Sequence, residues 1–267
     1  MRTKVGLALG GGAARGLAHI GVLQVLQKEE IPIDMIAGTS AGAAIGAIYA
    51  QGKDASTIEK IVMDLDWRRL ASLVDLALPR TGFIEGKKIT ALLRKIIGDD
   101  IKFDALKIPL ACIATDIVTG EEVIIEEGSV LEAVRASISV PVIFTVAKWK
   151  GRYLVDGGLV NPVPVSVLKS MGADFIIAVN VIPDRAYQDK NGAKELKKLS
   201  IFGVIMQSMY IGSYSLVKHC LEGADIVVQP KVGHIGVGEF RRAQELILQG
   251  KLAAQESIPE IRGLLAG

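Results

Sequence analysis

The sequence predicts an α/β fold with helices on both faces of a mostly parallel central sheet, and three observations support this. The chain has 267 residues, a length that one hydrophobic core can still enclose. Half of the residues are hydrophobic but only 5% are aromatic, so the core is aliphatic, as it is around buried parallel strands. Short apolar runs alternate with segments of helical periodicity, and we find no repeat or linker between them. We therefore expect a single three-layer α/β/α domain over residues 1–267.

The first fifty residues predict the order strand, helix, strand, helix. The apolar run Val5–Leu9 stops at three glycines, and apolar residues recur at helical spacing from Gly16 onward. A second strand ends at Gly38, and an alanine-rich helix follows from Ala41 to Gln51. Parallel strands joined by a helix are expected to cross over with right-handed geometry. The turns after the two strands then lie side by side, provided that the strands pair.

The remaining segments continue this alternation. Helices are expected over residues 54–73, 87–97, 129–137, 164–171, 201–221 and 239–252. Strands are expected on both sides of a turn at Thr119–Gly120, and over residues 175–181 and 225–229. A polar loop is expected over residues 184–198. Residues 169–267 as a whole are expected to complete the sheet and its helical cover.

Composition and charge exclude several classes of function. The net charge is +2 with acidic and basic residues interspersed, which argues against nucleic acid as a partner. The two cysteines, Cys112 and Cys220, lie in apolar segments, and no cluster of potential ligands offers a metal site, so we expect neither metal nor cofactor. The N-terminal apolar run is too short for a signal peptide, and no segment reaches the roughly 20 apolar residues of a membrane span. These features predict a soluble, cytoplasmic protein and leave its oligomeric state open.

The clearest motif is a serine among small residues, Gly38-Thr39-Ser40-Ala41-Gly42. It matches the pattern G-x-S-x-G, in which small neighbours permit a sharp turn from strand to helix that exposes the serine hydroxyl. The strand expected before it and the helix expected after it supply the context that the motif requires. The amino terminus of that helix adds backbone N–H groups and the positive end of a dipole. Ser40 is therefore the predicted nucleophile, and an ordinary serine-glycine turn is the alternative.

A glycine-rich loop follows the first strand and contains the candidate residues Gly10, Gly11, Gly12, Ala13 and Arg15. A dinucleotide-binding loop needs a G-x-G-x-x-G register and an acidic residue at the end of the second strand, and neither is complete here. If the first two strands pair, the N–H groups of the loop lie beside the serine and form an oxyanion hole. Arg15 either holds the loop through hydrogen bonds or meets a substrate phosphate, and we favour the structural role.

A third motif, Asp156-Gly157-Gly158, places a carboxylate at the end of an apolar run and before two glycines. Apolar neighbours raise the pKa of a carboxyl group above its reference value of about 3.9 and so increase its basicity. The alternative is an aspartate that only opens a turn at the end of a strand. The presence of all three motifs in one chain favours a catalytic role for Asp156.

The stretches GGGAARGLAHIGVL, GTSAG and DGGLVNPVP, in this order, resemble the patatin-like phospholipase family, especially its short bacterial members. The segment RASISVPVIF resembles the family's segment ahead of the aspartate, so the resemblance covers about residues 5–168. It implies a patatin-like fold and a Ser–Asp dyad, with Ser40 as nucleophile, Asp156 as base and the glycine loop as oxyanion hole. The sequence departs from the family at Ala13, where the family has a third glycine. An alanine is strained there if the loop requires a positive φ.

Histidine is the common general base, and the chain contains three: His19, His219 and His234. His19 and His219 lie in predicted helices and are expected to be structural. His234 lies in the loop after the last predicted strand and is the alternative base, in a triad. The early position of Ser40, after the second strand, argues against the ordinary α/β-hydrolase fold, whose serine follows a later strand.

These observations favour a serine acyl-ester hydrolase that forms an acyl-Ser40 intermediate and releases a fatty acid from a phospholipid or lysophospholipid. An acyltransferase with the same intermediate and a regulatory binding module without turnover are the alternatives. Residues 67–84 combine a tryptophan, adjacent arginines and several leucines, which suggests a flap that contacts lipid at the inner membrane surface. A packed helix and loop is the alternative for this segment.

Overall fold

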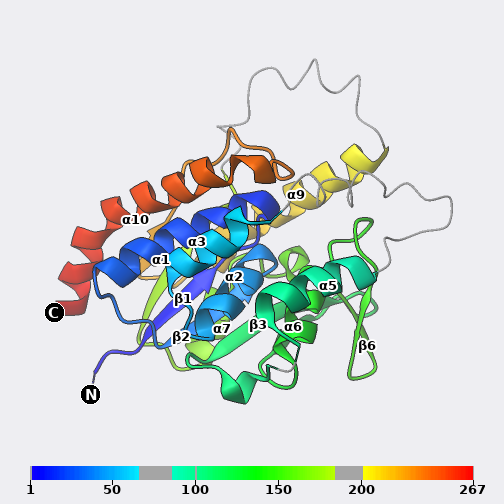
Figure 1. The fold of residues 1–267 in the computed structure, drawn as a ribbon, viewed down its shortest axis with the longest axis horizontal. Helices are drawn as coiled ribbons and strands as arrows, with labels where there is room; N and C mark the ends of the chain where they lie inside the picture. The colour runs from blue at the N-terminus through cyan, green and yellow to red at the C-terminus, as the bar shows by residue number, and fades with distance from the viewer. Residues whose placement is uncertain (1, 66–85, 100, 184–200, 267) are drawn as a thin grey trace.

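The computed structural model describes residues 2–65, 86–99, 101–183 and 201–266 (Figure 1). Within these residues, the strands form one sheet in the order β5-β6-β3-β2-β1-β7-β8, and β4 pairs with β3 off this path. The strands are β1 Val5–Leu9, β2 Met35–Thr39, β3 Leu110–Asp116, β4 Glu122–Ile125, β5 Ala147–Trp149, β6 Arg152–Asp156, β7 Phe175–Val179 and β8 Ile226–Val228.

The described helices are α1 Ala18–Lys28, α2 Ala41–Ala50, α3 Ala55–Met63, α5 Gly86–Ile97, α6 Val130–Ser137, α7 Val165–Ser170, α9 Ile201–Cys220 and α10 Ala243–Ala266. Short 3₁₀ turns add η1 Ala13–Leu17, η2 Phe103–Ala105, η3 Gly157–Leu159 and η6 Phe240–Arg242. None of the described helices is both long enough and apolar enough to cross a lipid bilayer.

The sheet is parallel in its middle and antiparallel along one side. β1 pairs in parallel with β2 and β7, and the parallel part continues through β3 on one side and β8 on the other. β4 and β6 both pair antiparallel with β3, and β5 pairs antiparallel with β6. The α/β class is therefore confirmed. The β5–β6 hairpin is an addition that the sequence analysis did not predict.

Helices cover both faces of the sheet, which confirms the three-layer arrangement. Successive residues of a strand point to opposite faces, and β1 follows this rule. Leu7 and Leu9 belong to the larger core cluster, which includes residues of α1, α2, α3 and α10. Ala8 belongs to a second cluster, with Val165 and Leu168 of α7. All five of these side chains are fully buried.

The first and last helices pack against each other through glycine. α10 lies along α1 (Figure 1), and each contributes one glycine to the contact. A Cβ atom on Gly21 would lie 1.9 Å from the carbonyl oxygen of Ile247, and one on Gly250 would lie 1.9 Å from that of Ala18. The two backbones can approach this closely only because neither glycine has a side chain.

Two helix ends differ from the sequence prediction. α3 ends at Met63 instead of residue 73, because the N–H of Leu65 bonds to the carbonyl of Val62 in a tighter closing turn. α10 continues past residue 252 to Ala266, because the buried residues Ile258 and Ile261 extend its apolar stripe. The proposed flap at 67–84 and the polar loop at 184–198 lie outside the described residues.

Candidate active site

Ser40 occupies a sharp turn between a strand and a helix, as the motif predicts. β2 ends at Thr39 and α2 begins at Ala41. Ser40 has φ 54° and ψ −119°, a conformation that is costly for a residue with a side chain and that is concentrated at functional sites. The residue is 7% exposed, so its hydroxyl lies in a largely enclosed environment.

The two glycines of this motif are required by space. A Cβ atom on Gly38 would lie 2.6 Å from the backbone nitrogen of Ala43, and one on Gly42 would lie 2.0 Å from the carbonyl oxygen of Leu9. Any side chain at either position would push the turn away from the strand beneath it. The small residues therefore allow α2 to start directly against β1 and β2.

Two hydrogen bonds hold this turn and a third fixes one of the acceptors; none of the three was predicted from the sequence. The backbone N–H of Ser40 donates to Ser137 Oγ at 2.8 Å, and that hydroxyl donates to the carbonyl of Ile113 at 2.5 Å. The Thr39 hydroxyl donates to the carbonyl of Asn161 at 2.8 Å. Ser137 lies within the segment RASISVPVIF, which was noted only for its resemblance to the family. No local pattern in that segment signals a contact with a residue 97 positions earlier.

Asp156 lies against the nucleophile because β2 and β6 share one edge of β3. Along this shared edge, β2 pairs with Leu110–Ile113 and β6 pairs with Ala114–Asp116. β4 pairs with Cys112–Thr115 along the other edge of β3. β2 runs parallel to β3 and β6 runs antiparallel, so their carboxyl ends meet. Thr39 is the partner of Ile113, and Asp156 is the partner of the next residue, Ala114.

The carboxyl group of Asp156 is buried and makes two hydrogen bonds. Ser40 Oγ donates to Oδ2 at 2.6 Å, and the N–H of Gly158 donates to Oδ1 at 2.8 Å. Burial raises the pKa of Asp156 from 3.8 to about 6, although the bonds from Ser40 and Gly158 act in the opposite direction. The group is therefore ionised near neutral pH and is a stronger base than an exposed aspartate.

The glycine loop lies against Ser40, but its N–H groups are not all available. A Cβ atom on Gly11 would lie 3.4 Å from Ser40 Cβ, which places the loop beside the serine. The N–H of Gly10 donates to the carbonyl of Val179 at 3.1 Å, and that of Gly11 donates to Pro162 at 2.9 Å. These two groups are already used, which corrects the expectation that Gly10 and Gly11 donate to an oxyanion.

Further along the loop, the N–H groups of Ala14 and Arg15 donate to Val237 and Gly12. Within the part of the chain that the structure describes, the N–H groups of Gly12 and Ala13 have no backbone acceptor. Ala13 has φ 49°, so the alanine that replaces the family's glycine does occupy a left-handed conformation. The set of possible oxyanion donors in the loop is thereby reduced to these two residues.

Arg15 makes contacts with protein groups. Its side chain is buried, its Nε donates to the carbonyl of Ile235 at 2.7 Å, and its guanidinium lies 5.4 Å from the centre of the Tyr210 ring. These contacts are those of a residue that holds the loop. The backbone N–H of Arg15 is used as well, by the carbonyl of Gly12, and the expected place of Arg15 in the oxyanion hole stays a prediction.

The three histidines make their described contacts away from the carboxylate and the serine. His19 Nε2 lies 2.7 Å from the carbonyl oxygen of Gly10, and burial lowers the pKa of His19 to about 4, so its ring is neutral and donates this bond. His219 contacts Glu222 on the surface. His234 Nε2 lies 2.8 Å from Glu245. Within the described residues, neither Ser40 nor Asp156 has a histidine partner.

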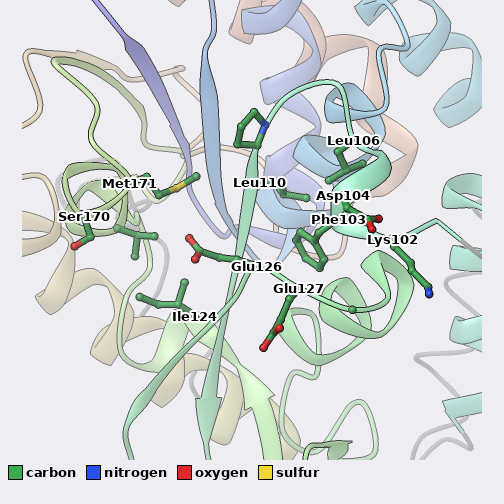
Figure 2. A pocket seen from close by; sticks show the side chains of 13 residues that line it. Lys102, Phe103, Asp104, Leu106, Leu110, Ile124, Glu126, Glu127, Ser170 and Met171 are labelled. Atoms are coloured by element: carbon green, nitrogen blue, oxygen red, sulfur yellow. The ribbon is translucent and has the colours of Figure 1, made fainter.

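A separate concavity of about 770 Å³ lies near the amino end of β3, whereas Ser40 lies near the carboxyl end of the parallel strands. Figure 2 shows the apolar side chains of Phe103, Ile124 and Met171 around it, together with the carboxylate of Glu126. Ser40 follows the carboxyl end of β2, and no residue of the predicted site lines this concavity. We therefore do not assign the reaction to it.

Comparison with known proteins settles the family. The family model described as patatin-like phospholipase matches residues 7–169, close to the residues 5–168 over which the resemblance was noted. The chain belongs to the patatin-like phospholipase family. An uncharacterized NTE family protein of Mycobacterium tuberculosis is 36% identical over 178 residues, which are 67% of this chain and 49% of that protein.

Two further similarities extend this result. Human patatin-like phospholipase domain-containing protein 6 is 30% identical over 238 residues, which cover 86% of this chain but 16% of the human protein. The crystal structure of the type III effector protein ExoU has a TM-score of 0.52 at 15% identity, over 97% of this chain and 53% of that chain, and supports the fold alone. The chain spans about half the length of the mycobacterial relative, and less of the human one.

Proposed function

We propose that this patatin-like chain is a serine acyl-ester hydrolase that cleaves phospholipids or lysophospholipids. The observation that carries the proposal is the 2.6 Å hydrogen bond from Ser40 Oγ to Asp156 Oδ2, made at a strained turn between a strand and a helix. The family name supports a lipid ester as the substrate class. Asp156 acts as the general base, and the N–H groups of Gly12 and Ala13 act as the oxyanion hole.

In the first step, Ser40 Oγ attacks the ester carbonyl carbon while its proton moves to Asp156 Oδ2. The carbonyl oxygen takes the negative charge and accepts hydrogen bonds from the loop N–H groups, which are typically worth about 2.7–4 kcal/mol each in such sites. The ester C–O bond then breaks, and Asp156 returns the proton to the departing alcohol. The product of this step is an acyl-Ser40 enzyme.

In the second step, water attacks the acyl carbon and gives a proton to Asp156. The bond to Ser40 Oγ breaks, the proton returns to Ser40, and the fatty acid leaves. A carboxylate with a pKa of about 6 cannot remove the serine proton completely in advance. Proton transfer is therefore concerted with attack, and the oxyanion donors must supply much of the barrier reduction.

The direct test is to locate the nucleophile. A fluorophosphonate probe should form an adduct with Ser40, which peptide mass spectrometry can map, and Ser40→Ala should abolish it. A panel of phospholipids and lysophospholipids should then release fatty acid from the wild-type protein but not from Ser40→Ala. Labelling of another serine that persists in Ser40→Ala would rule out the proposed nucleophile. Labelling of Ser40 without turnover of any ester would favour a binding module instead.

The same assay tests whether histidine takes part. His219→Gln and His234→Gln should retain most of their turnover, because neither ring contacts the serine or the carboxylate, and glutamine at 234 can still donate to Glu245. Asp156→Asn should lose a factor of about 10²–10⁴, as is typical when a general base is removed. An equally large loss in a folded His234→Gln variant would replace the dyad with a triad.

A further inference from the structure

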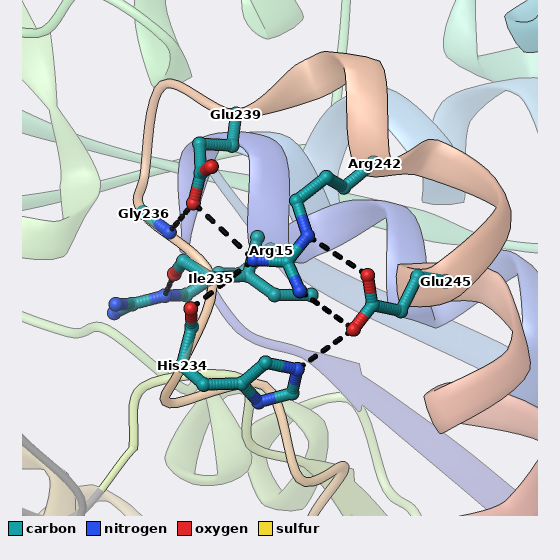
Figure 3. A network of polar contacts seen from close by, with 7 residues as sticks. All are labelled: Arg15, His234, Ile235, Gly236, Glu239, Arg242 and Glu245. Atoms are coloured by element: carbon teal, nitrogen blue, oxygen red, sulfur yellow. Dashed lines mark hydrogen bonds and ion pairs between the residues drawn. The ribbon is translucent and has the colours of Figure 1, made fainter.

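The last residues of the glycine loop, Ala14 and Arg15, are held by a segment from the far end of the chain. The N–H of Ala14 donates to the carbonyl of Val237 at 3.0 Å. Arg15 Nε donates to the carbonyl of Ile235 at 2.7 Å, as Figure 3 shows. Both acceptors belong to the loop Val232–Glu239, which lies outside the residues matched by the family model. The position of the glycine loop therefore depends on a segment more than 200 residues away.

This distant loop is itself tightly held. Val232 and Ile235 are fully buried, and the N–H of Ile235 donates to the carbonyl of Val232 at 3.1 Å. The N–H of Gly236 donates to the carboxylate of Glu239. The loop is therefore closed by its own hydrogen bonds and anchored by two apolar side chains, so it can serve as a rigid support.

An ion pair at the start of α10 secures the loop from its other side. Arg242 Nε and Nη2 donate to the two oxygens of Glu245 at 2.8 and 2.7 Å, and Arg242 Nη1 donates to the carbonyl of His234 at 3.2 Å (Figure 3). The His234 ring lies 2.8 Å from the same carboxylate. Two-point contacts between arginine and a carboxylate restrict geometry as well as adding energy. We call Val232–Glu239 with Arg242 and Glu245 the C-terminal clamp.

The loop that the clamp holds is strained and has to be positioned accurately. Ala13 has φ 49°, and a residue with a side chain keeps such a conformation only where its surroundings enforce it. The next two residues, Ala14 and Arg15, are the ones that the clamp bonds. Oxyanion donors are effective only when they are oriented before the charge develops. The clamp therefore constrains the backbone directly after this strained residue.

We propose that the C-terminal clamp positions the N–H groups of Gly12 and Ala13 for the reaction, and that Arg242 and Glu245 are positioning residues for catalysis. The inference rests on the proposed function, since it concerns the same oxyanion hole. It assigns a role to a part of the chain that the family match does not cover. Arg242 and Glu245 act through Ile235, Val237 and Arg15 and do not touch the substrate.

The test compares Arg242→Ala and Glu245→Gln with a matched control, Arg262→Ala. Arg262 pairs with Glu29 at 2.8 Å near the other end of α10 and makes no described contact with the loop. Active sites are counted by fluorophosphonate titration, and kcat and KM are expressed for each active site. The affinity for an acyl trifluoromethyl ketone, which forms a tetrahedral adduct with the serine, is measured alongside. Thermal unfolding of all three variants reports their stability.

We expect kcat in Arg242→Ala and Glu245→Gln to fall by between about 10-fold and about 100-fold, as small displacements of positioned groups cause, with a smaller change in KM. The ketone should bind more weakly by a similar factor, because it depends on the same donors. Arg242→Lys keeps the charge but loses the two-point contact and should give an intermediate value. Arg262→Ala should match the wild type in kcat and in ketone affinity.

Three results would overturn the inference. The first is unchanged kcat for each active site in Arg242→Ala, and the second is an equal loss in Arg262→Ala. The third is a variant with fewer active sites in the fluorophosphonate titration but with an unchanged kcat for each remaining site. That result would show that the clamp contributes to folding alone. If the wild-type protein itself is not labelled at Ser40, the proposed function fails and the inference fails with it. Normal labelling of the wild type with an unaffected Arg242→Ala refutes the clamp only.

Discussion

Replacement of Asp156 by asparagine should lower turnover by a factor of about 10²–10⁴ and yet stabilise the folded protein above pH 6. Asparagine has nearly the same shape and can keep both contacts of the carboxyl group: its oxygen accepts from the N–H of Gly158, and its amide donates to Ser40 Oγ. It has no charge to bury and cannot accept the serine proton. The same change therefore acts in opposite directions on activity and on stability.

The size of the stability effect follows from the pKa of Asp156. Burial raises the pKa of Asp156 from 3.8 to about 6, so the folded protein binds this proton more tightly than the unfolded chain does. The resulting stabilisation is complete below about pH 3.8 and is lost as the pH rises through about 6. A shift of about two pKa units corresponds to about 3 kcal/mol of unfolding free energy above pH 7.

The measurement is urea unfolding of the wild type and of Asp156→Asn at pH 4.5 and at pH 8. These two pH values lie on either side of the folded-state pKa of Asp156. The free-energy difference between the two proteins should shift in favour of the variant by about 2 kcal/mol between these pH values, because part of the full effect is already lost at pH 4.5. Asp104→Asn, at an exposed position, serves as the control. In parallel, kcat/KM of the wild type should rise with pH through about 6, as the carboxyl group ionises.

Two outcomes would refute this reasoning. A difference in unfolding free energy that does not change with pH would mean that Asp156 is not a buried carboxyl group with a raised pKa. Turnover in Asp156→Asn close to that of the wild type would mean that another group removes the proton from Ser40. Either result, found in a variant with a normal unfolding transition, would contradict the site described above.

The remaining predictions concern the turn and the loop beside the nucleophile. Ser137→Ala leaves the buried N–H of Ser40 without its acceptor and should cost about 1–3 kcal/mol of unfolding free energy, with a lower kcat for each active site; unchanged values would show that this bond is dispensable. Ala13→Gly relieves the positive φ and should raise the unfolding free energy by up to about 1 kcal/mol, and a clear loss would contradict the strain. Gly42→Ala places a Cβ atom 2.0 Å from Leu9 O and should lower the unfolding free energy by at least about 2 kcal/mol, measured by urea unfolding.

The sequence by itself determined the local parts of this protein. The alternation of apolar runs and helical periodicity predicted β1, α1, β2 and α2 in order, because each of these patterns is contained within a few turns or a few strand residues. The turn at Ser40 was predictable for the same reason. Its glycines are needed by contacts within the same strand, turn and helix, or with the neighbouring strand that the same pattern predicts.

The tertiary structure decided which of these groups meet and which remain available. The sequence placed Asp156 at a strand end, but only the sharing of one edge of β3 by β2 and β6 brings it to Ser40. The glycine loop was recognisable, yet the use of its N–H groups depends on distant carbonyls, such as those of Val179 and Pro162. Such pairings join residues far apart in the chain and are set by strand order and packing, so no local pattern encodes them.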